Sequence, residues 1–133
     1  MLIHSEKEMM QAGEDYAKKL VAPTTIELVG DVGAGKTTFV RGLAKGLGVK
    51  AELSSPSFTI SRSYAGEKYI LTHYDFYRLT DPGLMSEDLA ESITDPQTIT
   101  VIEWGQSIAD VLPENTQKIS IQYIDENTRE LSL

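Results

Sequence analysis

The glycine-rich segment from Gly30 to Thr38 constrains the fold of this chain more than any other segment. It contains the pattern G-x-x-x-x-G-K-[ST], in which Gly35, Lys36 and Thr37 occupy the last three positions. Glycines allow the backbone to curl so that consecutive N–H groups point inward at phosphate oxygens. In such a loop the lysine approaches the β- and γ-phosphates, and the hydroxyl group ligates Mg²⁺. The segment therefore predicts a phosphate-binding loop that also opens a helix.

A dinucleotide site and a plain glycine-rich turn are the alternatives to this interpretation. Gly33 and Gly35 begin the dinucleotide pattern G-x-G-x-x-G, but Thr38 stands where the third glycine belongs, so that pattern fails. In a plain turn, Lys36 would only be solvated. The apolar run over 25–29 and the helical pattern after the loop provide the context that a phosphate loop requires. This context favours the phosphate loop.

The hydrophobic pattern predicts helices and strands on both sides of the loop. Ser5 and Glu8 have the spacing of a capping box, with Ser5 as the N-cap of a helix that Pro23 ends. Further helices are expected over 39–47 and 86–92, and strands over 25–29, 58–64, 69–75, 98–103, 118–124 and 128–133. The last two strands pair naturally as a hairpin.

Composition excludes several classes of protein. The 133 residues suffice for one domain with one hydrophobic core. Asp and Glu outnumber Lys and Arg by 20 to 12, and a net charge of −8 does not suit binding of nucleic acid through bulk charge. The absence of cysteine excludes disulfides, thiolate zinc sites and a cysteine nucleophile. We expect a cytoplasmic protein, because residues 1–11 lack the apolar core of a signal peptide and no apolar run reaches about 20 residues.

A phosphate loop of this kind also needs a carboxylate at the end of a neighbouring strand, which holds Mg²⁺ or its water molecules. Asp75 ends the strand expected over 69–75, and Glu103 ends the strand expected over 98–103. A buried carboxylate at such a place requires a cationic partner. Both residues are therefore candidates for metal binding and catalysis. The structural alternatives are a salt bridge to Arg78 for Asp75 and an exposed strand end for Glu103.

Three features near these carboxylates have a functional and a structural interpretation. His73 shares a strand face with Asp75, and it is either a sensor of the γ-phosphate or a satisfied structural histidine. Trp104 is the only tryptophan and follows Glu103 directly, and on its own it is typical of core packing. The hydroxyl-rich loop over 54–59 suits a switch that responds to the γ-phosphate, with an ordinary turn as the alternative.

Four motifs, taken in order, resemble the TsaE (YjeE-type) family, the ATPase of bacterial threonylcarbamoyladenosine tRNA modification. They are the phosphate loop over 30–39, Ser55-Pro56-Ser57-Phe58-Thr59, His73-Tyr74-Asp75-Phe76-Tyr77-Arg78-Leu79 and Ile102-Glu103-Trp104. The resemblance covers nearly the whole chain, and the last two motifs are more specific to the family than the phosphate loop. Gly105 departs from the family pattern, in which proline is frequent at that position.

The resemblance implies an α/β fold. Residues 1–133 would form a single P-loop NTPase-like domain of three layers, with a mixed parallel and antiparallel sheet and helices packed on its faces. It also implies binding of ATP or ADP with Mg²⁺, and slow ATP hydrolysis by the isolated protein. Family members work with the TsaD–TsaB pair, which transfers the threonylcarbamoyl group to the adenosine beside the anticodon. This chain would then contact tRNA only indirectly, through that complex.

The resemblance also implies roles for individual residues. The nucleotide phosphates would be wrapped by Gly33, Ala34, Gly35, Lys36, Thr37 and Thr38. Lys36 would hold phosphate and Thr37 would hold Mg²⁺. Asp75 resembles the Walker B carboxylate, and Glu103 resembles the metal-linked acidic residue needed for hydrolysis. Asp75, Glu103 and Lys36 are thus the expected catalytic residues.

The adenosine part of the nucleotide is implied to lie near Trp104, Ser5 and Arg129. The guanine-reading pattern N-K-x-D is absent, since Asn127 is followed by Thr128, and this favours adenine. No arginine finger stands out in the sequence, so we expect slow turnover alone and stimulation by a partner. Two other functions stay open, namely a small-molecule kinase and a nucleotide-binding regulatory module without turnover. The kinase is less favoured because the chain has no cluster of arginines for a lid.

Overall fold

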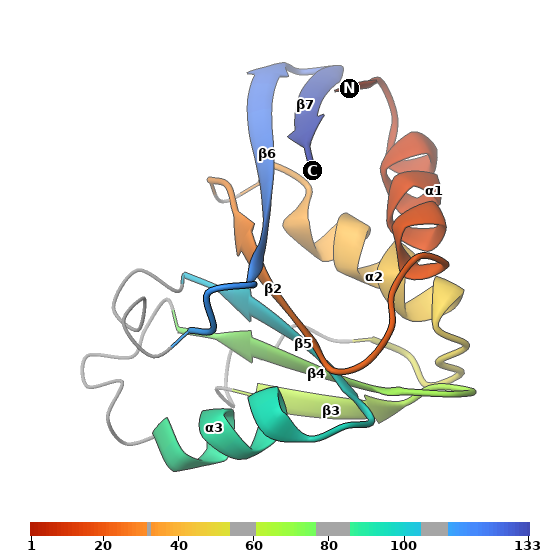
Figure 1. The fold of residues 1–133 in the computed structure, drawn as a ribbon. Helices are drawn as coiled ribbons and strands as arrows, with labels where there is room; N and C mark the ends of the chain where they lie inside the picture. The colour runs from red at the N-terminus through yellow and green to blue at the C-terminus, as the bar shows by residue number, and fades with distance from the viewer. Residues whose placement is uncertain (32, 54–60, 77–85, 105–111) are drawn as a thin grey trace.

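The computed structural model describes residues 1–31, 33–53, 61–76, 86–104 and 112–133, and Figure 1 shows their arrangement. The helices are α1 (Glu6–Ala17), α2 (Lys36–Gly46) and α3 (Ser86–Thr94). The strands are β1 (Leu2–Ile3), β2 (Thr24–Val29), β3 (Ser61–Ala65), β4 (Ile70–Asp75), β5 (Thr98–Glu103), β6 (Gln117–Asp125) and β7 (Thr128–Ser132). None of the helices in these ranges has both the length and the apolar character needed to cross a membrane.

The strands join one sheet in the order β1–β7–β6–β2–β5–β4–β3. The central neighbours β6, β2, β5 and β4 run parallel. At the two edges, β3 pairs antiparallel with β4, and β7 pairs antiparallel with β6 and β1. Parallel neighbours end at the same edge of a sheet, which is where such folds bind ligands. The mixed sheet confirms the expected α/β fold and brings the ends of β2, β5 and β4 together.

Helices cover both faces of the sheet and give three layers, with α1 and α2 on one side and α3 on the other (Figure 1). Along β5, Ile99 and Val101 belong to the core beneath α1 and α2, whereas Ile102 belongs to a second cluster with Leu89 of α3. Alternate residues of a strand point to opposite faces, so this division follows from the sequence pattern. β5 is buried at every position, as expected for a central parallel strand.

Tyr74 links β4 to α3 on the second face of the sheet. Its hydroxyl group donates to the backbone carbonyl oxygen of Asp88 at 3.2 Å and also lies 3.3 Å from the carboxylate of that residue. Burial raises the pKa of Tyr74 to about 12, and the charge of Asp88 adds to the rise. The phenol therefore stays protonated, and remains a donor, throughout the physiological pH range.

The backbones of α1 and α2 approach closely because glycines stand where they cross. A Cβ atom added to Gly42 would collide with the carbonyl oxygen of Met10, and one added to Gly13 would collide with the carbonyl oxygen of Phe39. No other side chain fits at these positions without moving a helix. The contact holds α2, which begins at Lys36, in a defined direction against the sheet.

The start of α1 confirms the predicted N-cap and alters the predicted capping box. Ser5 Oγ accepts a hydrogen bond from the Glu8 N–H at 3.1 Å. The Glu8 carboxylate, however, accepts from the His4 N–H at 2.7 Å, one residue before the cap. The prediction that Pro23 ends this helix was wrong. α1 ends at Ala17, because the chain then tightens into a turn that buries Leu20 in the core.

The other elements follow the expected ones, with small differences at their ends. β1 was not predicted, because two residues are too few to show a hydrophobic pattern, and its pairing with β7 is long-range. The strand expected over 58–64 is described from Ser61 onward, so 58–60 lie outside the described residues. α3 continues to Thr94, and the predicted hairpin forms between β6 and β7.

Replacing Gly42 with alanine should lower the free energy of unfolding, although alanine normally favours helices over glycine. The added methyl group would push α1 away from α2, and overpacking of this kind costs about 1–3 kcal/mol. Chemical denaturation followed by circular dichroism measures the change. Arg41→Ala is the matched control, because Arg41 is the exposed neighbour of Gly42 on the same helix. A Gly42→Ala variant as stable as this control would contradict the close helix contact.

Candidate nucleotide-binding site

The segment between β2 and α2 is a tight loop that needs its glycines. Gly33 and Gly35 have φ angles of +82° and +110°, in the left-handed region that favours glycine. Gly30 lies so close to β6 that an added Cβ would come within 2.6 Å of the carbonyl oxygen of Ile121. The helix begins directly at the end of the loop, where the Phe39 N–H donates to the Gly35 carbonyl at 3.0 Å. The strand, loop and helix that the motif requires are all present.

The first turn of α2 presents a positive helix end with no acidic side chain to compensate it. The turn contains no Asp or Glu, and its N-cap residue, Gly35, makes no side-chain hydrogen bond. By contrast, α1 begins with a serine cap and two acidic residues in its first turn. The N–H groups at a helix start carry partial positive charge and bind anions, phosphates included. Thr37 and Thr38 belong to this turn, so the predicted phosphate site over 33–38 has suitable electrostatics.

Lys36 extends from the first turn of α2 into a buried position. Its side chain is 8% exposed, and its Nζ lies 3.7 Å from Oε1 of Glu103. The same ammonium group lies 4.2 Å from the centre of the Trp104 ring, which is a cation–π distance. A buried ammonium group needs such partners to offset its loss of water. The sequence pattern required a cationic partner for a buried carboxylate at a strand end, and for Glu103 that partner is Lys36.

Glu103 is buried at the end of β5 and divides its two carboxylate oxygens between two partners. Oε1 faces Lys36, and Oε2 lies 2.5 Å from Nε2 of His73. The alternative interpretation of Glu103, as an exposed strand end, is therefore wrong. His73 comes from β4 and lies in register with Val101 of the neighbouring strand β5. Because Val101 and Glu103 point to the same face, the imidazole of His73 reaches the carboxylate.

Asp75 ends β4 and lies opposite Glu103 in the register of the two strands. The Phe76 N–H then donates to the Glu103 carbonyl at 3.1 Å, which keeps the two backbones together at the sheet edge. The Asp75 side chain is half-buried. Its alternative partner, Arg78, lies outside the described residues, as do the hydroxyl-rich loop over 54–59 and Gly105. The two predicted carboxylates thus come to the same edge of the sheet.

The oxygen atoms at this edge suit Mg²⁺ that binds together with a nucleotide. Within the described ranges, no group of three or more His, Asp or Glu side chains is arranged to hold a metal ion. Mg²⁺ in nucleotide sites keeps several waters and binds phosphate oxygens, so it needs only one or two protein ligands. The Thr37 hydroxyl and the carboxylates of Asp75 and Glu103 are hard oxygen ligands of this kind. Their assignment as metal ligands stays a prediction.

Trp104 turns the chain sharply at the end of β5. Its φ angle of +59° is rare for a residue other than glycine, and such backbone strain concentrates at functional sites. The side chain packs against the cluster of Tyr74, Phe76 and Ile102 and also lies against the Lys36 ammonium group. Trp104 therefore combines the core packing that was one interpretation with a place beside the phosphate loop.

Arg129 of β7 reaches the phosphate loop, whereas Ser5 caps α1. Nη2 of Arg129 lies 3.5 Å from the Gly33 carbonyl oxygen, and its guanidinium group lies 4.5 Å from the centre of the Tyr123 ring. Nη1 donates to the carbonyl oxygen of Asp125 at 2.7 Å. These contacts hold the guanidinium group beside the loop. The predicted contacts of Ser5 and Arg129 with adenosine stay predictions.

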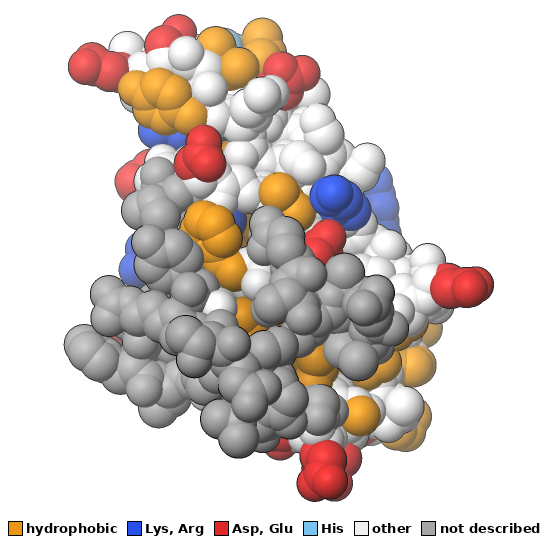
Figure 2. All heavy atoms as spheres, turned by 90° about the vertical axis from the view of Figure 1, so that its left-hand side faces the viewer, with side chains coloured by type: hydrophobic (Ala, Val, Ile, Leu, Met, Phe, Trp, Pro, Cys, Tyr) orange, Lys and Arg blue, Asp and Glu red, His pale blue; other side chains and the backbone are white. Residues whose placement is uncertain are grey.

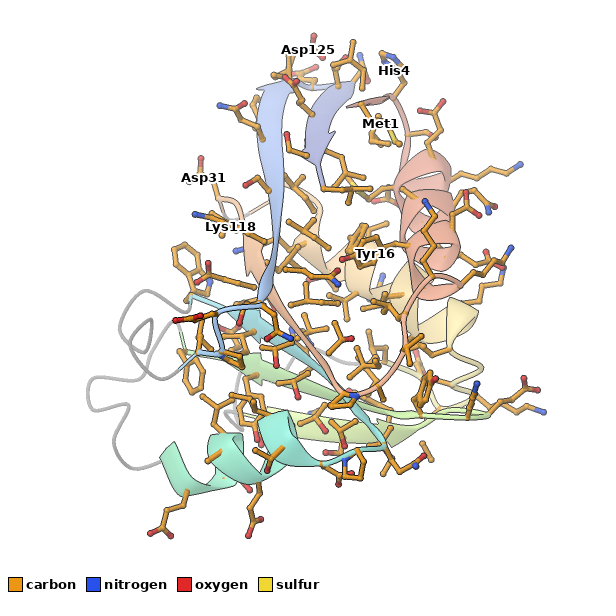
Figure 3. The ribbon with its side chains drawn as sticks, in the orientation of Figure 1. Met1, His4, Tyr16, Asp31, Lys118 and Asp125 are labelled. Atoms are coloured by element: carbon orange, nitrogen blue, oxygen red, sulfur yellow. The ribbon has the colours of Figure 1, made fainter. Side chains whose placement is uncertain are left out.

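The surface near the site carries charges of both signs. Figure 2 shows acidic and basic side chains scattered over this face, with no basic patch among the residues that it colours by type. Figure 3 shows Asp31 projecting outward from the phosphate loop and Lys118 projecting from β6, and both side chains are exposed.

Sequence reasoning missed the two contacts that organise the site. These are the pairing of His73 with Glu103 and the position of Trp104 against Lys36. A histidine two residues before one strand-end carboxylate, and a tryptophan directly after the other, were the available signals. Neither signal identifies a partner, because the order of the strands in the sheet cannot be predicted from short stretches of sequence.

The Lys36–Glu103 ion pair should show strong energetic coupling in the nucleotide-free protein. Lys36→Met and Glu103→Gln each remove one charge of the pair, and breaking a buried pair in this way destabilises a protein by up to about 3–5 kcal/mol. The double variant removes both charges, so its loss of stability should fall short of the sum of the two single losses by at least ~1 kcal/mol. Denaturant unfolding of the four proteins measures this coupling. Additive losses would contradict a direct ion pair.

Comparisons with known proteins place this chain in a family. Residues 3–131 match the model of a family described as threonylcarbamoyl adenosine biosynthesis protein TsaE. A tRNA threonylcarbamoyladenosine biosynthesis protein TsaE from Treponema pallidum is 35% identical over 129 residues, covering 97% of this chain and 95% of that protein. The protein of the same name from Aquifex aeolicus is 34% identical, covering 100% of this chain and 93% of that protein.

A solved structure agrees with these sequence matches. The crystal structure of YdiB from Bacillus subtilis superposes with a TM-score of 0.83 at 29% sequence identity, covering 98% of this chain and 80% of that chain. The fold, the phosphate loop and the sequence matches all lead to one conclusion: this chain belongs to the TsaE family.

Proposed function

We propose that this protein binds ATP, hydrolyses it slowly, and acts in the biosynthesis of threonylcarbamoyladenosine in tRNA. The family assignment and the names of its relatives support the pathway. One observation carries the biochemical activity. The lysine of a phosphate loop is buried against a strand-end carboxylate, at a helix start that lacks acidic residues. This is the arrangement that an incoming polyphosphate needs.

Binding of ATP would change the partner of Lys36. The phosphates would lie in the loop over 33–38, against the N–H groups at the start of α2. The Lys36 ammonium group would then turn from Oε1 of Glu103 to the β- and γ-phosphate oxygens. Trp104 lies against the same ammonium group and would shield it from water while it moves. In this proposal, Glu103 holds the Lys36 ammonium group close to the loop where the phosphates would bind.

Hydrolysis would use the carboxylate that this exchange releases. Once Lys36 contacts phosphate, Oε1 of Glu103 would be free to accept a hydrogen bond from the attacking water and to orient it. The Thr37 hydroxyl and Asp75 would hold Mg²⁺, with Glu103 near it. When bound, Mg²⁺ neutralises the charge that develops on the β- and γ-oxygens during transfer. Glu103, Asp75 and Lys36 are the catalytic residues of this proposal.

The isolated protein should turn over slowly. Phosphoryl transfer to water is accelerated by an arginine that reaches the γ-phosphate. In the part of the chain that the structure describes, the arginine that contacts the phosphate loop is Arg129, and it bonds the Gly33 carbonyl at 3.5 Å. We therefore expect a partner to supply a group that reaches the γ-phosphate, and we propose the TsaD–TsaB complex as that partner. Contact with tRNA would then be indirect, through that complex, which the net charge of −8 favours. We propose that the protein acts in the cytoplasm.

The proposal is tested by ATP hydrolysis, measured with the purified protein alone and with the TsaD–TsaB complex. Turnover should be low alone, rise with the complex, and fall by about 100-fold or more in Lys36→Ala, since removal of a group that stabilises transition-state charge has effects of this size. Lys118→Ala is the matched control, because Lys118 is an exposed lysine on the neighbouring strand β6.

Each alternative function predicts a different result in the same experiment. Phosphate transferred to a small acceptor rather than to water would favour a kinase. Tight binding of ATP without turnover, even with the complex present, would favour a regulatory module. Hydrolysis that is the same in Lys36→Ala and in Lys118→Ala would contradict the proposed site.

A further inference from the structure

The carboxylate of Glu103 is held from two directions, and the two partners differ in kind. Lys36 reaches Oε1 from the phosphate loop at 3.7 Å, and this contact is lost when Lys36 turns to a nucleotide. His73 reaches Oε2 at 2.5 Å from β4, the strand next to β5, where its side chain is buried. The contact with Lys36 is therefore exchangeable, whereas the contact with His73 joins two neighbouring strands of the sheet.

The hydrogen bond that His73 makes has a defined direction. Its Nδ1 is buried and has no hydrogen-bond partner among the described residues. A hydrogen on Nδ1 would be a buried donor without an acceptor, and it would leave the lone pair of Nε2 facing a carboxylate. Of the two neutral tautomers, the one with its hydrogen on Nε2 therefore fits the contact, and it donates that hydrogen to Oε2 of Glu103.

We propose that His73 is a positioning residue that fixes the Glu103 carboxylate while Lys36 changes partner. This inference rests on the proposed function and deepens it. By donating Nε2–H to Oε2, His73 keeps the carboxylate plane constant, so that Oε1 is the oxygen directed at the reacting water once Lys36 has left it. Each carboxylate oxygen of Glu103 has one of these two contacts, so His73 would be the partner that stays when Lys36 leaves.

The position of His73 in the sheet supports this role. His73 is 2% exposed and pairs in register with Val101, so the parallel ladder of β4 and β5 sets its distance from Glu103. Two side chains on adjacent central strands are held more firmly than two on a loop. Displacement of a catalytic group by about 1 Å can cost about 100-fold in rate, so a rigid support of this kind has a measurable effect.

Nitrogen NMR of the imidazole rings tests the contact without any use of activity. The chain contains two histidines, so His73 and the exposed His4 give a simple spectrum in which His4 is the internal reference. We expect the Nε2–H tautomer for His73, both without nucleotide and with a non-hydrolysable ATP analogue and Mg²⁺. Glu103→Gln should shift the His73 signals and leave those of His4 unchanged. An Nδ1–H tautomer, or no response to Glu103→Gln, would overturn the inference.

Three substitutions of His73 separate positioning from packing. The amide nitrogen of glutamine lies near the place of Nε2, whereas that of asparagine lies near Nδ1 and leucine has no donor. His73→Leu and His73→Asn should lower kcat by about 10- to 100-fold with the Kd for ATP changed less than about twofold. His73→Gln should recover most of the loss. A packing role predicts the opposite order, with leucine the best replacement.

Thermal unfolding of each variant shows that it is folded, and Thr72→Val is the matched control. Thr72 is the buried neighbour of His73 on β4 and points to the other face of the sheet, so its kcat should stay that of the wild type. Wild-type kcat in His73→Leu, together with Lys36-dependent hydrolysis by the unmodified protein, overturns the inference alone. An unmodified protein that does not hydrolyse ATP under any condition overturns both the inference and the proposed function.

Discussion

The buried contact between Lys36 and Glu103 is the interaction on which the rest of the site depends. It joins the first turn of α2 to the end of β5, and the ammonium group is also covered by Trp104. Burial of two charges costs several kcal/mol per ion before their attraction is counted, so such a pair is a poor device for stability alone. We infer that the pair has a functional role, because it keeps the Lys36 ammonium group at the place where phosphate oxygens would bind.

The fold brings these groups together through the order of its strands. The phosphate loop follows β2, and β5 and β4 are the next two strands of the sheet, all parallel. Their carboxyl ends therefore lie at one edge, where Glu103 and Asp75 stand in register and Lys36 enters from α2. The close crossing of α1 and α2 at Gly13 and Gly42 holds the helix that carries the lysine, and the antiparallel hairpin of β6 and β7 brings Arg129 to the loop.

Local features of the site were predictable from sequence, and its long-range contacts were not. The phosphate loop, the Ser5 cap and the two strand-end carboxylates each depend on residues a few positions apart. The partners of His73 and Trp104 depend on which strands are neighbours, and β1 depends on pairing with the far end of the chain. The early end of α1 at Ala17 has the same origin, since the burial of Leu20 overrides the local signal of Pro23. The overall fold that the resemblance to the TsaE family implied is confirmed.

We infer that Glu103 and phosphate compete for the same ammonium group, and nucleotide binding without Mg²⁺ tests this competition most directly. With Mg²⁺ removed by a chelator, any role of Glu103 as a metal ligand disappears and only the competition remains. Glu103→Gln should then bind ADP about tenfold more tightly than the wild type, which corresponds to about 1.4 kcal/mol released from the ion pair. Glu91→Gln removes the same charge from an exposed position on α3 and should leave the affinity unchanged. Equal or weaker binding by Glu103→Gln would contradict the exchange of Lys36 between carboxylate and phosphate.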